Sequence, residues 1–531
     1  MIRLRTICYF FCTVTFSVCA QVNLEWTARY NGIDNLRDRG FAIAVDDSGF
    51  IYVTGVSLGA ITDRDYITIK YTPSGDTVWV RLFNGPENGF DVARDIAIDD
   101  SGNVYVTGTS VMGTMKYDKD GNEIWFRRFG QFSAGYRIDI DKDGSIYVAG
   151  ESNNNYATVK YDTEGNQLWA HTYNGPGNLQ DRISDIVIDN NDDVIVTGRS
   201  RGTVTDYDIA TIKYSGSTGD TLWLRRYNGP SPSQPYDSGD AITVDDRNNV
   251  YVTGWSDGIN GAAQCIVIKY SSDGELLWER RFPPGGGYGM AGYDIINDPS
   301  GYIYAAARSH GNEDRLFKYD YEGNLMWTKQ YIAAHLFATN PPRLALDIFG
   351  NVYMSSANSS EYAYYIILKY DPDGNQLFEY RYHEPPVSGS LSINAAYDIH
   401  VDADMNIYLT GESLVSGMGT DFDILTIKLS QDSTTSVQGT AIIPSAFKLL
   451  PAYPNPFNSS TNITFTLPYS SDVGMKIYNI LGEEITTLIS EYRTAGFHTI
   501  NWDAGDLPSG LYLGKLQAGS NHGIVKILLI R

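Results

Sequence analysis

The sequence predicts an all-β protein, an eight-bladed β-propeller followed by a small β-sandwich. Three observations predict this fold class. One strand-like block recurs eight times, the repeat stops near Leu429, and a different pattern of alternating strands follows it. The last residues of consecutive copies are 53, 42, 48, 56, 53, 49 and 55 positions apart. This spacing is typical of a four-stranded propeller blade.

The recurring block is rich in Val, Ile and Tyr, as β-strands are. Three further blocks accompany it: an apolar stretch that ends in Asp, a Lys-Tyr block and a tryptophan block. Turn sequences such as DKDGN bound these blocks, so none has room for three helical turns. We call the four strands a, b, c and d in chain order. The copies of strand b are FIYVTG (50–55), NVYVTG (103–108), SIYVAG (145–150), DVIVTG (193–198), NVYVTG (249–254), YIYAAA (302–307), NVYMSS (351–356) and NIYLTG (406–411).

The first and last blocks of the repeat are out of phase. LEWTARY (24–30) is a d block that precedes every other block, whereas the eighth copy ends at IKL (427–429) without a d block. A ring explains both facts, because the N-terminal segment can supply the missing strand of the last blade. We therefore expect residues 24–30 to close the ring.

Polar residues that recur in every blade are expected to be structural. The Asp at the end of strand a and the Lys of strand c each occur eight times, which favours pairing within or between blades over one active site. The tryptophans are expected to pack between blades. Arg127, Arg225 and Arg280 on strand d would protect an outer edge strand from pairing with other chains.

The N-terminus has the pattern of a secretory signal peptide over residues 1–20. Arg3 and Arg5 precede an apolar run that is too short for a membrane anchor, and Val18 and Ala20 suit a cleavage site. We expect no membrane-spanning segment in the mature chain. Cys265 would be its only cysteine, so no intramolecular disulfide is expected.

Composition and motifs argue against several classes of function. The net charge of −23 repels phosphate backbones, so nucleic acid is not an expected partner. The G-x-S-x-G matches lack the helix that a hydrolase elbow needs. The Asp-rich turns lack the Glu of a calcium loop and suit tight hairpins instead, although weak calcium binding remains an alternative. We expect no catalytic residue, no metal and no cofactor.

The C-terminal part differs from the repeat. Residues 431–446 are polar and form an expected linker, and residues 447–531 predict a β-sandwich. Its strand-like segments are YPNPFNSSTNITF (453–465), VGMKIYNILGEEI (473–485), GFHTINWD (496–503) and SGLYLGKL (509–516).

Both parts resemble known families. Residues 21–430 resemble the SBBP family of bacterial β-propeller repeats, which is named for seven blades and implies a fold but no chemistry. The last domain resembles the type A C-terminal sorting domain of the type IX secretion system. It also resembles the immunoglobulin-like domain of flagellar hook-capping proteins, and a stalk or adhesion module stays open. The residues that carry the sorting resemblance are Tyr453, Pro454, Asn455, Pro456, Phe457, Ser509, Gly510, Tyr512 and Lys526.

The sorting resemblance implies a route and a partner. It implies passage through the periplasm, recognition by the secretion machinery, and a final location outside the cell or on its outer surface. The family does not say whether the domain is later cleaved.

The b–c and d–a loops vary most in length, so function is expected on the face that carries them. Candidate ligand-binding residues there are Trp255, Tyr236, Tyr207 and Tyr288. We expect a monomeric, secreted or cell-surface binding or scaffold protein whose ligand is a glycan or a protein. The alternatives are an extracellular carbohydrate-active enzyme, either a lyase or a glycosidase, and a structural part of the envelope.

Overall fold

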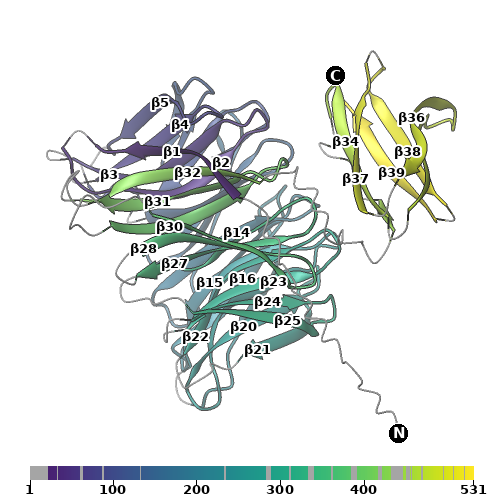
Figure 1. Cartoon of the computed structure of the whole chain (residues 1–531). Coiled ribbons are helices and arrows are strands. Elements are labelled where there is room, and N and C mark those ends of the chain that lie inside the picture. Colours follow the sequence, from purple (N-terminus) through teal and green to yellow (C-terminus); the bar gives the residue numbers. More distant parts are fainter. Residues whose placement is uncertain are drawn as a thin grey trace, which may run out of the picture. The chain divides into compact units, whose positions relative to one another are not determined.

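The described part of the chain consists of strands, turns and loops in two compact units (Figure 1). The computed structural model describes residues 22–530 except 33, 60–63, 86–88, 110, 132, 233–234, 283–288, 310–312, 333–339, 360–362, 384–391, 416–420, 432–446, 450–451, 453–454, 456, 468–469, 494–495, 506 and 520. The predicted signal peptide lies outside these residues, as does the predicted linker apart from Gln431. One unit reaches Asp432, and the other begins at Ser433.

The described part of the first unit contains eight antiparallel sheets of four strands each. In seven of them the strands follow one another in sequence. These are β2 (Asp38–Val45), β3 (Ile51–Leu58), β4 (Arg64–Tyr71), β5 (Thr77–Phe83); β6 (Ala93–Ile98), β7 (Val104–Gly108), β8 (Gly113–Tyr117), β9 (Glu123–Arg127); β10 (Ser133–Ile140), β11 (Ile146–Ser152), β12 (Asn155–Tyr161), β13 (Gln167–Tyr173); β14 (Asp181–Ile188), β15 (Val194–Arg201), β16 (Tyr207–Tyr214), β17 (Thr221–Tyr227); β18 (Asp237–Val244), β19 (Val250–Asp257), β20 (Ala263–Tyr270), β21 (Leu276–Phe282); β22 (Met290–Asn297), β23 (Ile303–Ser309), β24 (Glu313–Tyr319), β25 (Leu325–Ile332); and β26 (Arg343–Leu346), β27 (Val352–Ser359), β28 (Ala363–Tyr370), β29 (Gln376–Tyr382).

The eighth sheet joins the two ends of the unit. Its order is β30 (Ser392–Val401), β31 (Ile407–Val415), β32 (Asp423–Gln431) and β1 (Val22–Tyr30). Figure 1 shows β1, in purple, beside β32, in green. The first strand of each sheet contacts the first strand of the next, and β30 contacts β2, so the sheets form a closed ring. The prediction that the N-terminal segment supplies the missing strand is confirmed.

In seven of the eight described sheets, side chains of strands c and d fasten the sheet to a turn of the next sheet. The carbonyl of Thr163 accepts hydrogen bonds from Trp125 Nε1 at 3.1 Å and from Lys116 Nζ at 2.9 Å. Arg127 Nε donates to the Gly165 carbonyl of the same turn at 2.6 Å. Trp indole donors make equivalent bonds at Trp26, Trp79, Trp169, Trp223, Trp278 and Trp327. The strand-d arginines thus bind the neighbouring sheet, a role that their pattern in the sequence did not indicate.

The Asp at the end of strand a organises its own turn. Asp99 Oδ1 accepts the N–H groups of Ser101 and Asn103 at 3.0 and 2.9 Å, and Oδ2 accepts the Tyr105 hydroxyl at 3.0 Å. The strand-c lysine also pairs with this Asp in some sheets, as Lys213 does with Asp189 at 2.6 Å. These contacts agree with the structural interpretation of the repeated Asp and Lys residues.

The second unit is a sandwich of two sheets. One contains β33 (Lys448–Leu449), β34 (Ser460–Leu467) and β37 (Gly496–Asp503), in that order. The other has the order β36 (Glu484–Arg493), β35 (Ser471–Asn479), β38 (Gly510–Ala518) and β39 (Asn521–Leu529). Both sheets contribute to one apolar core, in which Phe465 and Trp502 pack with Met475, Leu516 and Ile527.

Candidate ligand site on the loop face of the ring

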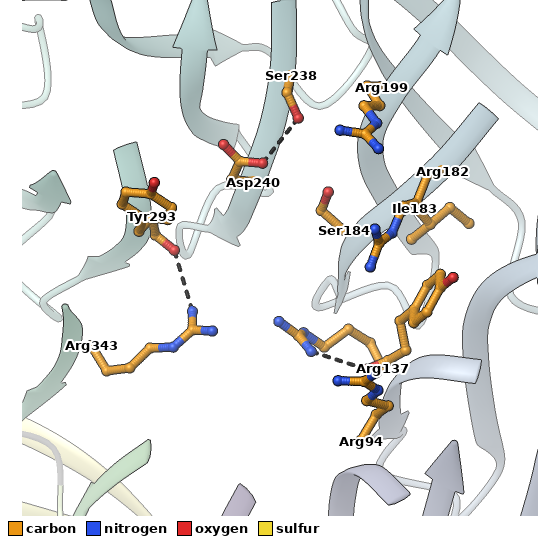
Figure 2. Close-up of a pocket in the computed structure, with 11 residues that line it drawn as sticks. Arg94, Arg137, Arg182, Ile183, Ser184, Arg199, Ser238, Asp240, Tyr293 and Arg343 are labelled. Atoms are coloured by element: carbon orange, nitrogen blue, oxygen red, sulfur yellow. Dashed lines mark hydrogen bonds between the residues drawn. The ribbon is translucent and has the colours of Figure 1, made fainter. Parts of the chain in front are cut away.

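A polar cavity of about 310 Å³ lies among the first strands of six consecutive sheets (Figure 2). Its lining residues come from β6, β10, β14, β18, β22 and β26, with one from β15. We call it the arginine cavity, and define it by Arg94, Tyr136, Arg137, Arg182, Ile183, Ser184, Arg199, Ser238, Asp240, Tyr293 and Arg343. Most of these positions precede the middle of strand a, and Arg199 lies near the end of strand b. The cavity therefore belongs to the face that carries the b–c and d–a loops, which we call the loop face.

A repeated bulge places side chains in this cavity. In seven sheets the pairing of strands a and b shifts by one residue, five positions before the terminal Asp. A bulge leaves one residue unpaired and redirects side chains. The unpaired residues that line the cavity are Arg94, Tyr136, Ser184, Asp240 and Tyr293.

At the position that follows the bulge on strand a, the residue type repeats with a period of four sheets. In chain order this position is occupied by Ala42, Asp95, Arg137, Asp185, Ala241, Asp294, Arg343 and Asp398. Every second sheet thus has an aspartate here, and the two arginines each fall between two of them. The four carboxylates accept N–H groups from the following sheet, namely those of Ile138, Ile242, Leu344 and Ile43, at 2.8–3.0 Å. Strand a is the inner edge of each sheet, so these bonds satisfy N–H groups that have no neighbouring strand.

Five guanidinium groups enter the arginine cavity, and Figure 2 shows those of Arg94, Arg137, Arg182 and Arg343 around one common space. Arg137 pairs with Asp185 at 3.2 Å. Arg182 lies 4.7 Å from the ring centroid of Tyr136, and Arg94 lies 5.3 Å from that of Phe41. Burial, together with repulsion from Arg182 and Arg137, lowers the pKa of Arg94.

Asp240 is the only carboxylate among the residues that define the cavity. Ser238 Oγ donates a hydrogen bond to it at 2.9 Å. Burial raises the pKa of Asp240 to about 7, while nearby arginines oppose that shift. A carboxyl group with such a pKa exchanges its proton near neutral pH.

Three of the four predicted ligand-binding residues lie together. The ring centroid of Tyr236 is 5.2 Å from those of both Tyr207 and Trp255. Asp257 holds the group in place, since it accepts the Tyr236 N–H at 3.0 Å and Trp255 Nε1 at 3.1 Å. We call Tyr207, Tyr236 and Trp255 the aromatic cluster. Tyr288 lies outside the described residues.

Arg199 connects the aromatic cluster to the arginine cavity. Its guanidinium lies 5.1 Å from the ring centroid of Tyr207, and it donates a hydrogen bond to the Tyr236 hydroxyl. The same side chain lines the cavity. The sequence interpretation proposed the aromatic residues as candidates but did not propose any of the five arginines. The sequence feature that could have pointed to the arginines is the presence of charged residues inside otherwise apolar strands, as in ARDIAI (93–98).

Three buried carboxyl groups on the first strands of their sheets make the stability of the ring depend on pH. Burial raises the pKa of Asp139 to about 7 and the pKa values of Asp95 and Asp398 to about 6. Because unfolded Asp titrates near 4, the folded ring binds more protons than the unfolded chain between about pH 4 and 7. The stability from these groups is therefore present at low pH and is lost as pH rises through 6 to 7.

We accordingly expect a lower melting temperature at pH 8 than at pH 5.5. Asp139→Asn should reduce this difference, because it removes the group whose pKa is raised furthest of the three. Thermal melts of both proteins at the two pH values measure the effect. An unchanged difference in Asp139→Asn would show that Asp139 does not titrate as stated.

Most sorting-motif residues that the structure describes lie on the last strand of the sandwich or contact it. Asn455 Oδ1 accepts the Leu528 N–H at 2.7 Å, and the Phe457 N–H donates to the Leu528 carbonyl at 2.9 Å. Tyr512 donates its hydroxyl to the Pro508 carbonyl at 2.8 Å, and its ring packs on Trp502. Lys526 lies on β39, and its carbonyl accepts Asn455 Nδ2 at 2.9 Å. Gly510 is the first residue of β38 and Ser509 immediately precedes it, whereas Tyr453, Pro454 and Pro456 lie outside the described residues.

Comparisons with known families agree with both units. Residues 451–531 match the secretion system C-terminal sorting domain. Residues 78–110, 124–157 and 223–261 match the β-propeller repeat family SBBP. The chain therefore contains β-propeller repeats of this kind and a type IX C-terminal sorting domain. The sorting domain marks this chain as a protein exported by type IX secretion to the cell surface or the extracellular space. None of its described residues forms a helix suited to crossing a membrane.

Solved structures resemble this chain at low sequence identity. A quinohemoprotein alcohol dehydrogenase from Comamonas testosteroni is 12% identical, with a TM-score of 0.49, over 81% of this chain and 78% of that one. Virginiamycin B lyase from Staphylococcus aureus is 13% identical, with a TM-score of 0.38, over 64% of this chain and 94% of that one. PorZ, a surface component of the type IX secretion system of Porphyromonas gingivalis, is 13% identical, with a TM-score of 0.38, over 94% of this chain and 60% of that one. No curated protein matches this chain.

Proposed function

We propose that this protein is a secreted or cell-surface binding protein that takes its ligand on the loop face of the ring. The observation that supports this proposal is that the arginine cavity and the aromatic cluster adjoin, with Arg199 shared between them. Ligand sites combine a concave surface, aromatic side chains and a few convergent polar groups. The ligand is a glycan or a protein, and the protein acts as a monomer.

The aromatic cluster is expected to supply much of the affinity. Tyr236→Ala and Trp255→Ala should each weaken binding about 10- to 30-fold, as the loss of a central aromatic contact does at other binding sites. Glycan and protein arrays probed with the mature chain identify the ligand, and titration calorimetry measures the variants.

Asp120→Ala and Asp373→Ala are the controls, because both residues lie in c–d turns on the opposite face. They should bind the ligand as the unchanged protein does. If these controls lose binding while Tyr236→Ala and Trp255→Ala bind fully, the ligand site lies on the opposite face and the proposal is wrong. Melting temperatures of all four variants separate lost contacts from lost folding.

The second candidate function is enzymatic, and Asp240 is the observation that favours it. Its pKa of about 7 suits a general acid or base, and it shares the cavity with Tyr293 and with arginines that can hold an anionic substrate. A lyase or glycosidase of this kind would cleave the glycan identified on the array. Asp240→Asn would then abolish turnover and leave binding within about threefold, whereas a binding protein shows no cleavage at all.

A further inference from the structure

We infer that the ligand is an acidic glycan whose carboxylate or sulfate groups bind in the arginine cavity. This inference rests on the proposed binding function and names the class of ligand. Arginine recognises carboxylate and sulfate oxygens through its planar fork of N–H donors. Three features of the cavity and its surroundings carry the inference.

The first feature is an excess of positive charge in an acidic protein. Five guanidinium groups and one carboxylate line the cavity, although the chain as a whole has a net charge of −23. Arg137 pairs with Asp185, and Arg343 interacts with Asp294 and Asp398, which leaves Arg94, Arg182 and Arg199 around Asp240. Such a concentration of like charge is unfavourable without a counter-ion, so it indicates a site that an anion completes.

The second feature is the lack of ion pairs at Arg94 and Arg182. Within the part of the chain that the structure describes, neither side chain pairs with a carboxylate, and each lies over an aromatic ring instead. Arg94 Nε is buried and has no hydrogen-bond partner among these residues. A buried donor without a partner is costly, and a ligand oxygen would satisfy it. The repulsion between Arg94 and Arg182 also shows that these side chains do not stabilise one another.

The third feature is the position of the aromatic cluster. Sugar rings present flat C–H faces that pack on aromatic side chains, and they carry hydroxyl groups for nearby polar side chains. The cavity volume of about 310 Å³ is at the small end of ligand pockets, so it would hold an acidic sugar unit rather than a folded partner. Arg199 would then contact both the anionic unit in the cavity and the chain that continues over Tyr207 and Tyr236. These relations favour an acidic glycan over an acidic peptide.

The test compares four probes on the mature full chain by titration calorimetry. They are oligogalacturonate, which carries carboxylates, a dextran sulfate oligosaccharide, a neutral dextran oligosaccharide and polyglutamate. We expect one or both acidic oligosaccharides to bind, with weaker binding at high salt. We expect the neutral oligosaccharide and polyglutamate to bind at least tenfold more weakly.

The variants Arg94→Gln and Arg182→Gln test the cavity itself. Each should weaken binding of the acidic oligosaccharide roughly 10- to 100-fold, the usual effect of losing a hydrogen bond to a charged group. Their melting temperatures should stay the same or rise, because each change relieves repulsion. Arg247→Gln is the matched control, since it removes an exposed arginine from an a–b turn on the opposite face and should change affinity less than twofold.

Several outcomes would overturn the inference. Equal binding of the neutral oligosaccharide, or unchanged affinity in both cavity variants, would show that the arginines do not bind an anionic group. Preference for polyglutamate would make the ligand an acidic peptide, and no binding of any probe would also refute the acidic-glycan class. A neutral ligand that is lost in Trp255→Ala but retained in Arg94→Gln would leave the proposed binding function standing while this inference fails.

Discussion

Deletion of residues 22–30 is expected to destabilise the ring more than any single substitution. These residues form β1, which pairs with β32 from Val22 opposite Gln431 to Tyr30 opposite Ile424. Its loss leaves β32 as an open edge with unpaired backbone groups. It also removes the Trp26 bond to the Pro73 carbonyl at 2.9 Å and the Arg29 ion pair with Asp423 at 2.7 Å.

The deleted protein should unfold at a much lower urea concentration or aggregate, with a loss of at least about 4 kcal/mol, the upper range of single core substitutions. Chemical denaturation followed by circular dichroism measures this loss. A synthetic peptide of residues 22–30 added in trans should restore part of the stability, because the missing strand is joined to its sheet without a covalent bond. A melting curve identical to that of the intact chain would mean that the ring does not need β1.

Truncation after Asp432 is expected to abolish delivery to the cell surface while leaving the ring folded. The sorting domain that directs export lies within residues 451–531. The ring has its own core, and its eight described sheets are complete at Gln431. The truncated chain keeps Gln431 because its side chain belongs to the ring. It accepts a hydrogen bond from Lys369 Nζ at 2.7 Å and donates one to the Tyr353 hydroxyl at 2.8 Å.

Cell fractionation and surface proteolysis in a host with type IX secretion measure the effect. The truncated protein should accumulate in the periplasm, with almost none outside, and its ring should melt as it does in the full chain. Arg247→Gln in the full-length chain is the control and should reach the surface normally. Surface delivery of the truncated protein would show that another segment directs export.

The sequence by itself determined the strand repeat and the way the ring closes. Alternating apolar residues and Asp-Gly turns are local signals, so each blade could be recognised without its neighbours. The phase difference between LEWTARY and IKL then required the two ends to meet, and β1 pairs with β32 accordingly. The aromatic cluster was partly predictable because the sequence interpretation placed Trp255 and Tyr236 in loops of unusual length, although Trp255 lies within β19 in the structure.

Only the tertiary structure decided which residues meet in the arginine cavity. Arg94, Arg182 and Arg343 are far apart in the sequence, and each looks like an ordinary polar residue of a strand. They converge because the ring directs every strand a toward its centre, and at Arg94 because a bulge also re-aims the side chain. Neither the closure of a ring nor a bulge is encoded by a short motif, so charges that are distant along the chain become neighbours only in the folded protein.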